Sequence, residues 1–381
     1  MDFAYTSEQT QLADALRRWL DNEYNFDTRR QIVKSAEGVS AKAWDGLVEM
    51  GLTALPIAEE QGGFGGGALD MLPVMQEIGR GLLIEPYFAT VWGAHFLQLA
   101  GGQQAVVEQV ASGEIKLACA LQERQARHEF FDITCQARPE GDGFVINGAK
   151  SVVLHGAQAD QLIVSARLAG SAQRGEDGIS LFLIPAASAG LTRREYRTID
   201  CQRACDLTLE NVFVPASHVL GQIGQAWEII QQANDYALCL LCAEAVGAML
   251  ALHAATLDYV KTRQQFGAPI GKSQVLQHRL AEMYMQIEQA QSMAMLAAMK
   301  YDSVPASEHR RIVAAAKVKI GQAAKYVGQQ AVQLHGGIGV TDELQAAHYF
   351  KRLTIIDLTL GDVDHHMARF IAQPQFITSA G

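Results

Sequence analysis

The sequence is poor in charged residues and in cysteine. Asp, Glu, Lys and Arg make up 19 % of its 381 residues, below the roughly 25 % typical of soluble domains. Acidic residues dominate that charge, since 41 Asp and Glu against 31 Lys and Arg leave a formal net charge of −10. Nucleic-acid binding needs a basic face, so this balance argues against it. Six cysteines at this length exclude a disulfide scaffold, and an apolar content of 49 % excludes intrinsic disorder.

The cysteines form no pattern typical of a metal or redox site. Cys239 and Cys242 have the spacing of a zinc or dithiol pair, but leucines surround them and no second pair follows at metal spacing. We therefore expect buried, reduced thiols. The first residues are polar and acidic, without the basic segment and apolar core of a signal peptide. Together these features predict a cytoplasmic protein.

One apolar run is long enough to raise the question of a membrane. Residues 236–255 form a stretch that only Glu244 and His253 interrupt, and its length could span a bilayer. An ionisable residue near the centre is unfavourable in lipid. A helix that is apolar on every side is also expected at the centre of a large soluble bundle. We therefore predict a buried helix and no membrane span.

The chain is too long for one ordinary compact core, and its patterns divide it into three zones. Residues 1–115 show helical spacing, and Thr6 with Gln9 has the pattern of a capping box that starts the first helix. Residues 116–230 contain short runs typical of strands, and residues 231–381 are helical again. These zones are the three domains that the sequence predicts.

The middle zone is predicted to be an antiparallel β-domain. Gly141-Asp142-Gly143 and Asn147-Gly148 have the composition of hairpin turns on either side of a strand at 144–146. No long helical pattern separates the strands, which argues against a βαβ sheet. No G-x-G-x-x-G motif follows a strand, so a Rossmann dinucleotide site is not predicted. Further strands are expected at 152–154, 162–164, 179–184 and 207–209.

Five motifs then occur in order across nearly the whole chain, and together they resemble those of the acyl-CoA dehydrogenase family. Two further segments, 242–247 and 348–353, are similar to the small subunit of pimeloyl-CoA dehydrogenase. The five motifs are Pro56-x-x-Glu59-Glu60-x-Gly62-Gly63-x-Gly65, Gly148-x-Lys150, Asn211-Val212-x-Val214-Pro215, Thr262-Arg263-x-x-Phe266-Gly267 and Gln333-Leu334-His335-Gly336-Gly337-x-Gly339.

The resemblance implies an α+β multidomain fold with an N-terminal α-helical domain, a central β-barrel and a C-terminal four-helix bundle. It also implies FAD at a subunit interface, an acyl-CoA substrate and an electron-transfer flavoprotein as the electron acceptor. The expected assembly is a homo-oligomer, or a heteromer with a large acyl-CoA dehydrogenase subunit.

The resemblance also implies which residues hold FAD. Arg263 and Phe266 correspond to the family's R-x-x-F-G motif, which reaches the FAD bound mainly by the neighbouring subunit. Gln333, Gly336 and Gly337 correspond to the Q-x-x-G-G turn beside the pyrophosphate or adenosine portion. The residue types suit this role, because arginine offers a charged fork to phosphate and glycine lets a backbone N–H approach closely.

The base that the family's reaction requires is missing from its usual positions. Family members remove the α-proton of a thioester with a carboxylate while the β-hydrogen leaves as hydride to the flavin, and a positioned base is essential for that step. The usual glutamate position falls on Leu360 in this sequence. The position used by a minority of the family falls on Ala237. Neither side chain can accept a proton.

Several interpretations remain open on the sequence alone. Glu244 is a candidate base, since it shares a helix face with Ala237 and burial raises the pKa of a carboxyl group, but it lies about 10 Å further along the axis. It is otherwise a structural glutamate paired with a cation, or a contact to a distal part of the substrate. Asp362 or Asp364 is a second candidate. In the third interpretation, this chain is the base-lacking partner in a heteromeric dehydrogenase. A flavin monooxygenase or flavin-binding scaffold on the same fold is a different class that would show the same substitutions.

Overall fold

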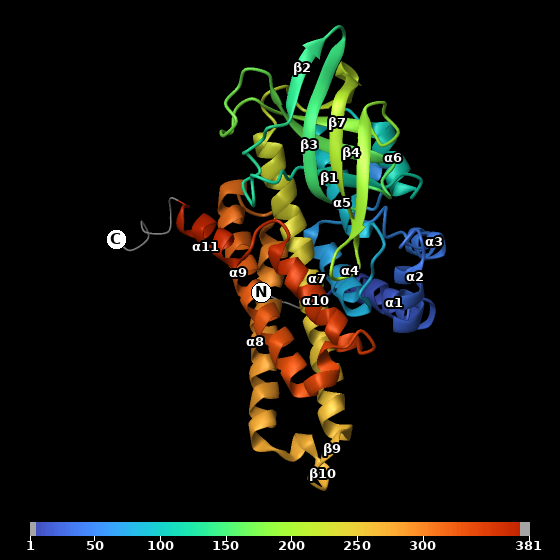
Figure 1. Cartoon of the computed structure of the whole chain (residues 1–381), viewed down its shortest axis with the longest axis vertical. Coiled ribbons are helices and arrows are strands. Elements are labelled where there is room, and N and C mark those ends of the chain that lie inside the picture. Colours follow the sequence, from blue (N-terminus) through green and yellow to red (C-terminus); the bar gives the residue numbers. More distant parts are fainter. Residues whose placement is uncertain (1–4, 374–381) are drawn as a thin grey trace. The chain divides into compact units, whose positions relative to one another are not determined.

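The computed structural model describes residues 5–373, and its elements follow the expected order of helices, sheet and helices (Figure 1). Contacts divide the chain into two compact units. The first, the helical unit, combines the residues up to Arg30 with Gly67–Leu83 and the chain from Leu238 onward. The second, the sheet unit, combines Gln31–Gly66 with Ile84–Ala237. The predicted order of N-terminal helices, a central β-sheet domain and C-terminal helices is confirmed.

The helical unit contains the N-terminal helix and the C-terminal bundle. Its first helix begins at the predicted capping box, because the Thr6 side chain accepts from the Gln9 N–H and the Gln9 side chain accepts from the Thr6 N–H. Its helices are α1 (Ser7–Glu23), α4 (Ala68–Gly81), most of α7 (Trp227–Thr262), α8 (Gln274–Lys300), α9 (Ala306–His335), the 3-10 helix η4 (Gly336–Val340), α10 (Gln345–Leu358) and α11 (Val363–Ile371), while α2 (Phe26–Lys34) crosses the unit boundary.

Helix α7 is buried along its apolar run. Among the described residues, it is the one helix long and apolar enough to cross a membrane, and 78 % of its most apolar window is buried. In the helical unit α7 and α4 approach backbone to backbone, because a Cβ at Gly79 would collide with the Glu244 carbonyl and one at Gly247 with the Gln76 carbonyl. The contact requires glycine on both helices and places Glu244 in the core.

The sheet unit is built on one eight-stranded sheet, in the order β6-β7-β3-β2-β4-β5-β8, with β1 paired to β4. Most pairs are antiparallel, as predicted, whereas β1 and β2 each pair with β4 in parallel. The strands are β1 (Leu117–Ala120), β2 (Gln136–Glu140), β3 (Gly143–Leu154), β4 (Gln161–Leu168), β5 (Ile179–Pro185), β6 (Leu191–Arg197), β7 (Arg203–Pro215) and β8 (Val219–Leu220), and the helices are α3 (Ala41–Glu49), η1 (Glu59–Gln61), α5 (Tyr87–Ala100), α6 (Gln104–Ala111) and η2 (Ala216–His218).

One of the two predicted turns is wrong. Residues 141–143 do form the β2–β3 connection, but Asn147-Gly148 lies inside β3, which continues to Leu154 with a bulge between Ile146 and Gly148. The Asn147 side chain accepts a hydrogen bond from the Asn211 N–H across the bulge. A Cβ at Gly148 would lie 2.6 Å from the Cys135 Cα. This glycine therefore permits close approach of the backbone just before β2, and the dipeptide alone does not distinguish this role from a turn.

Candidate functional site

The residues of the R-x-x-F-G motif, Arg263 and Phe266, lie just after the end of α7. Helix α7 is followed by a short hairpin, β9 (Gln264–Gln265) and β10 (Ala268–Pro269), which leads through the 3-10 helix η3 (Ile270–Lys272) into α8 (Figure 1). The Arg263 backbone closes this hairpin, since its N–H donates to the Tyr259 carbonyl and its carbonyl accepts from the Ile270 N–H. Phe266 lies at the tip with φ 53° and is fully exposed. The hairpin therefore presents Arg263 and Phe266 to solvent.

The Q-x-x-G-G turn lies at the same end of the helical unit. The Tyr259 ring is 4.5 Å from the His335 ring, and the Tyr259 hydroxyl donates to the His335 carbonyl. Helix α9 ends at His335, and its C-cap residue, Gly336, has φ 65°. A Cβ at Gly336 or Gly337 would meet no atom within 4 Å. The Tyr259–His335 contact places the Q-x-x-G-G turn at the end of the unit that carries the R-x-x-F-G hairpin. Gln333 is also exposed there.

These exposed groups suit an anionic and aromatic ligand. Within residues 5–373 the Arg263 guanidinium has no hydrogen-bond or ion-pair partner, and a guanidinium binds phosphate oxygens through two donors. Open space at Gly336 and Gly337 permits a ligand to approach the backbone closely. The exposed Phe266 ring offers a stacking surface. A dinucleotide cofactor with a pyrophosphate and planar rings fits this set of groups.

The usual base position is occupied by hydrocarbon. Leu360 follows α10 with φ 58° and is 9 % exposed. Its carbonyl accepts from His366 Nε2 at 2.9 Å, while Lys317 Nζ donates to the Asp357 and Gly361 carbonyls at 2.7 Å each. Burial lowers the pKa of Lys317 to about 8. These contacts satisfy carbonyls at the end of α10 and fix the loop, but none of them provides a carboxylate at the Leu360 position.

The two aspartates considered as a second candidate base differ in their surroundings. Asp362 is the N-cap of α11, and its Oδ1 accepts from the His365 N–H at 2.9 Å. Asp364 lies exposed in the first turn of the same helix. No group of three or more metal-ligating side chains is present in the part of the chain that the structure describes. The local structure thus gives Asp362 a capping contact.

Glu244 forms a buried ion pair with Arg352 of α10. Arg352 Nε donates to Glu244 Oε1 at 2.6 Å, and its terminal nitrogen donates to Oε2 at 2.7 Å. The side chains are 2 % and 4 % exposed, respectively. Both carboxylate oxygens are thus bound by one guanidinium in a bidentate pair. This geometry favours the interpretation of Glu244 as a structural glutamate paired with a cation.

The alternative base position, Ala237, is fully buried in the sheet unit. The preceding residue, Tyr236, stacks on His95 of α5 with ring centroids 4.1 Å apart. Burial lowers the pKa of His95 to about 4, so this imidazole is neutral at physiological pH. The surroundings of Ala237 thus include buried aromatic rings, and its own side chain cannot accept a proton.

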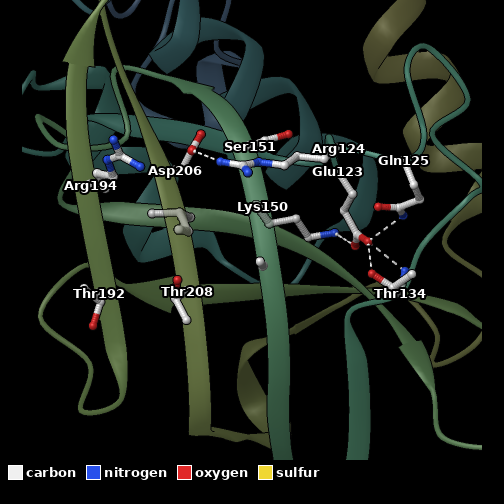
Figure 2. Close-up of a pocket in the computed structure, with 12 residues that line it drawn as sticks. Glu123, Arg124, Gln125, Thr134, Lys150, Ser151, Thr192, Arg194, Asp206 and Thr208 are labelled. Atoms are coloured by element: carbon white, nitrogen blue, oxygen red, sulfur yellow. Dashed lines mark hydrogen bonds and ion pairs between the residues drawn. The ribbon is translucent and has the colours of Figure 1, made fainter.

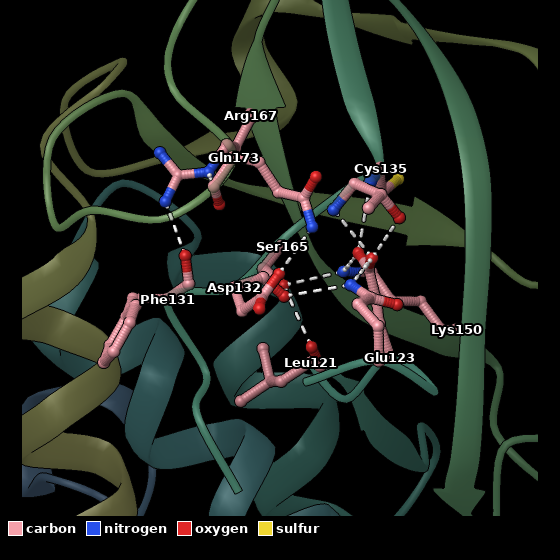
Figure 3. Close-up of polar contacts among 11 residues, drawn as sticks. Leu121, Glu123, Phe131, Asp132, Cys135, Lys150, Ser165, Arg167 and Gln173 are labelled. Carbon is pink, nitrogen blue, oxygen red and sulfur yellow. Dashed lines mark hydrogen bonds and ion pairs between the residues drawn. The ribbon is translucent and has the colours of Figure 1, made fainter. Parts of the chain in front are cut away.

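The sheet unit holds a buried charge network that the sequence gives no means of assembling. Lys150, known from its motif, donates to Glu123 Oε1 at 2.8 Å, with side chains 0 % and 2 % exposed (Figure 3). Glu123 also accepts from the Thr134 N–H and hydroxyl, the Gln125 amide and the Cys135 N–H. Burial alone raises the pKa of Glu123, but Lys150 and these donors outweigh it and lower the pKa. No motif marks Glu123, because it lies in the loop after β1 and its partner Lys150 lies on β3.

Arg167 of β4 organises the neighbouring loops (Figure 3). Its guanidinium donates to four carbonyl oxygens, namely those of Phe131, Gln173, Gly175 and Asp177. Burial lowers its pKa. The loops 124–134 and 171–178 are therefore tied to one buried side chain, and the first of them borders a cavity.

That cavity has a volume of about 440 Å³ and lies on one face of the sheet (Figure 2). The Gly148-x-Lys150 motif marks only a small part of it, because the other residues come from the loop after β1 and from strands β6 and β7, which the fold brings together. The lining residues are Glu123, Arg124, Gln125, Thr134, Ala149, Lys150, Ser151, Thr192, Arg194, Asp206, Leu207 and Thr208.

Comparison with known families agrees with the motifs. Residues 6–114 match the acyl-CoA dehydrogenase N-terminal domain, residues 118–212 the middle domain and residues 224–373 the C-terminal domain. The human mitochondrial short-chain specific acyl-CoA dehydrogenase is 31 % identical over 323 residues, which are 82 % of this chain and 77 % of that protein.

Solved structures give the same result. Butyryl-CoA dehydrogenase from Megasphaera elsdenii superposes with a TM-score of 0.89 at 25 % identity, over 97 % of this chain and 98 % of that one. The ChsE4–ChsE5 complex from Mycobacterium tuberculosis superposes with a TM-score of 0.87 at 25 % identity, over 97 % of both chains. The three matched domains, the shared fold and the relatives together show that this chain belongs to the acyl-CoA dehydrogenase family of FAD-dependent oxidoreductases.

Proposed function

We propose that this chain is the base-lacking partner subunit of a heteromeric acyl-CoA dehydrogenase. The observation that supports this proposal is the chemistry of the two usual base positions and of Glu244. Leu360 and Ala237 are hydrocarbon, and both oxygens of Glu244 are bound by Arg352. Proton removal next to a thioester requires a carboxylate within hydrogen-bond reach of the α-carbon. A second chain would supply that carboxylate.

In this proposal the chain still contributes to FAD binding. The Arg263 guanidinium would bind the pyrophosphate, Phe266 would stack on a ring, and the turn of Gln333, Gly336 and Gly337 would lie against the phosphate or adenosine portion. All five residues are exposed at one end of the helical unit, where a second chain has access. FAD, when bound, supplies the acceptor for the hydride. An acyl-CoA is the proposed substrate and an electron-transfer flavoprotein the proposed electron acceptor.

Solved relatives provide a precedent for two-chain assembly. The ChsE4–ChsE5 structure is described as a complex of two named proteins. A second structure, described as the Tcur3481–Tcur3483 steroid acyl-CoA dehydrogenase, also names two proteins and superposes with a TM-score of 0.86 at 27 % identity. These likenesses show that the fold occurs in structures of two named proteins, which supports the proposed heteromer.

Anaerobic flavin spectroscopy tests the proposal. The chain purified alone should not bleach bound flavin when acyl-CoA thioesters are added, whereas a complex with its base-containing partner should. A homo-oligomer that bleaches, and loses this activity on Glu244→Gln, would refute the proposal and identify Glu244 as the base. Absence of bleaching in the complex as well would favour a flavin monooxygenase or scaffold.

A gain-of-function variant tests the same reasoning from the opposite direction. Leu360→Glu restores a carboxylate at the usual base position of this chain. It should allow the chain, loaded with FAD, to bleach on addition of acyl-CoA, while the matched Leu360→Gln variant should not. Equal behaviour of the two variants would show that the missing carboxylate is not what limits this subunit.

A further inference from the structure

The acidic groups of the 440 Å³ cavity in the sheet unit are already satisfied by donors. Asp206 accepts from the Arg124 guanidinium at 3.0 Å, the Val152 N–H at 3.2 Å and the Tyr196 hydroxyl at 3.0 Å. Burial alone raises the pKa of Asp206, but these donors outweigh it and hold the pKa below its usual value. The other acid, Glu123, is saturated by Lys150 and its neighbours. The acids thus have little capacity left for a cation or for a ligand rich in donors.

Several donors of the cavity remain unused. The β6–β7 register places Arg194 opposite Asp206 and Thr192 opposite Thr208, and alternation along each strand puts these four on one face of the sheet. Within residues 5–373 the side chains of Arg194, Thr192, Thr208 and Ser151 make no hydrogen bond or ion pair. Figure 2 shows them around the cavity, with Arg124 reaching over from the loop after β1.

The charge balance is positive. Lys150 and Glu123 cancel each other in the floor, and Asp206 offsets one of the two arginines, Arg124 and Arg194. One positive charge therefore remains together with three free hydroxyl groups. Arg194 lies on β6, at the edge of the sheet order, so its guanidinium is accessible. A guanidinium with adjacent hydroxyl donors is a typical recognition set for carboxylate or phosphate oxygens.

We propose that this cavity is a binding site for a small molecule that carries an oxyanion group, either phosphate or carboxylate. Arg194 is the principal charged contact, and Thr192, Thr208 and Ser151 are the neutral donors. The volume of about 440 Å³ lies within the range of small-molecule pockets, roughly 300–1,000 Å³. The ligand is therefore larger than a single inorganic ion and of metabolite size. The cavity belongs to the sheet unit, whereas Arg263 and Leu360 belong to the helical unit.

Calorimetric titration of the FAD-loaded protein tests the site with three probes: inorganic phosphate, pyrophosphate and succinate. We expect saturable binding of at least one probe. Arg194→Ala should weaken that binding about tenfold or more, the effect of losing a charge-assisted hydrogen bond. The matched control is Arg193→Ala, because Arg193 is the next residue on β6 but donates to the Ala157 carbonyl outside the cavity. The affinity of Arg193→Ala for the probe should stay within about twofold of the wild type. The flavin content of both variants should also stay within about twofold of the wild type.

The outcomes separate the possible ligands. Binding of the phosphates alone identifies a phosphate ester as the ligand class, and binding of succinate alone identifies a carboxylate. Thr208→Val, which removes one neutral donor without changing the charge, should weaken binding by a few-fold. The proposal is overturned if no probe binds, or if Arg193→Ala and Arg194→Ala weaken binding equally, since a general charge effect would then explain the titration.

Discussion

The Glu244–Arg352 pair leads to the sharpest prediction about the helical unit. Arg352→Met should remove both hydrogen bonds to the Glu244 carboxylate and leave a charge in the core. Both side chains are nearly inaccessible, 2 % and 4 % exposed, and are joined by two bonds of 2.6 and 2.7 Å. Breaking one side of a buried pair with this geometry destabilises a protein by about 3–5 kcal/mol. Glu244→Leu should cost a similar amount, because Arg352 then loses both of its hydrogen bonds to this carboxylate.

The double variant Glu244→Leu/Arg352→Met distinguishes a lost pair from lost packing. Replacing a buried pair by apolar residues of similar size is often close to neutral, so the double variant should be more stable than either single variant. Urea unfolding, monitored by the loss of helical signal, gives the free energy of unfolding of the wild type, the two single variants and the double variant. The coupling energy follows from these four values. A coupling energy below about 1 kcal/mol, the range of an exposed pair, would refute this reasoning.

Two further predictions concern the cofactor end and the α10 loop. Arg263→Ala should weaken FAD retention by about tenfold or more, measured as the flavin-to-protein ratio after gel filtration. The control variant Lys261→Ala, which removes an exposed cation at the end of α7, should retain flavin. Unchanged flavin in Arg263→Ala would contradict the assignment. The pKa of Lys317 is lowered by burial to about 8, so the unfolded chain binds more protons than the folded chain between pH 8 and pH 10.5, and the contribution of Lys317 to stability rises with pH across that window. Thermal unfolding of wild type and Lys317→Met at pH 7.5 and 10 should show the wild type gaining relative to the variant, and a difference independent of pH would count against a buried charged lysine.

Local sequence signals were reliable where the physical cause is local. The Thr6–Gln9 capping box starts a helix because both hydrogen bonds join residues three apart. The apolar run of α7 is buried because no face of the helix carries enough polar side chains to be stable in water. The glycine-rich turn at 141–143 connects adjacent strands. The Asn147-Gly148 prediction failed because a turn and a bulge use the same residue types, and only the neighbouring backbone at Cys135 distinguishes them.

The sequence by itself determined the family, the order of the domains and the absence of a carboxylate at Leu360 and Ala237, since these depend on residue identity along the chain. Only the tertiary structure decided what the remaining polar groups contact. Glu244 and Arg352 are 108 residues apart, and Arg124 and Asp206 are 82 apart. Long-range packing and strand register create such pairs, and neither can be read from spacing. The same contacts decide which acids are saturated and leave Arg194 with an unoccupied guanidinium in the cavity.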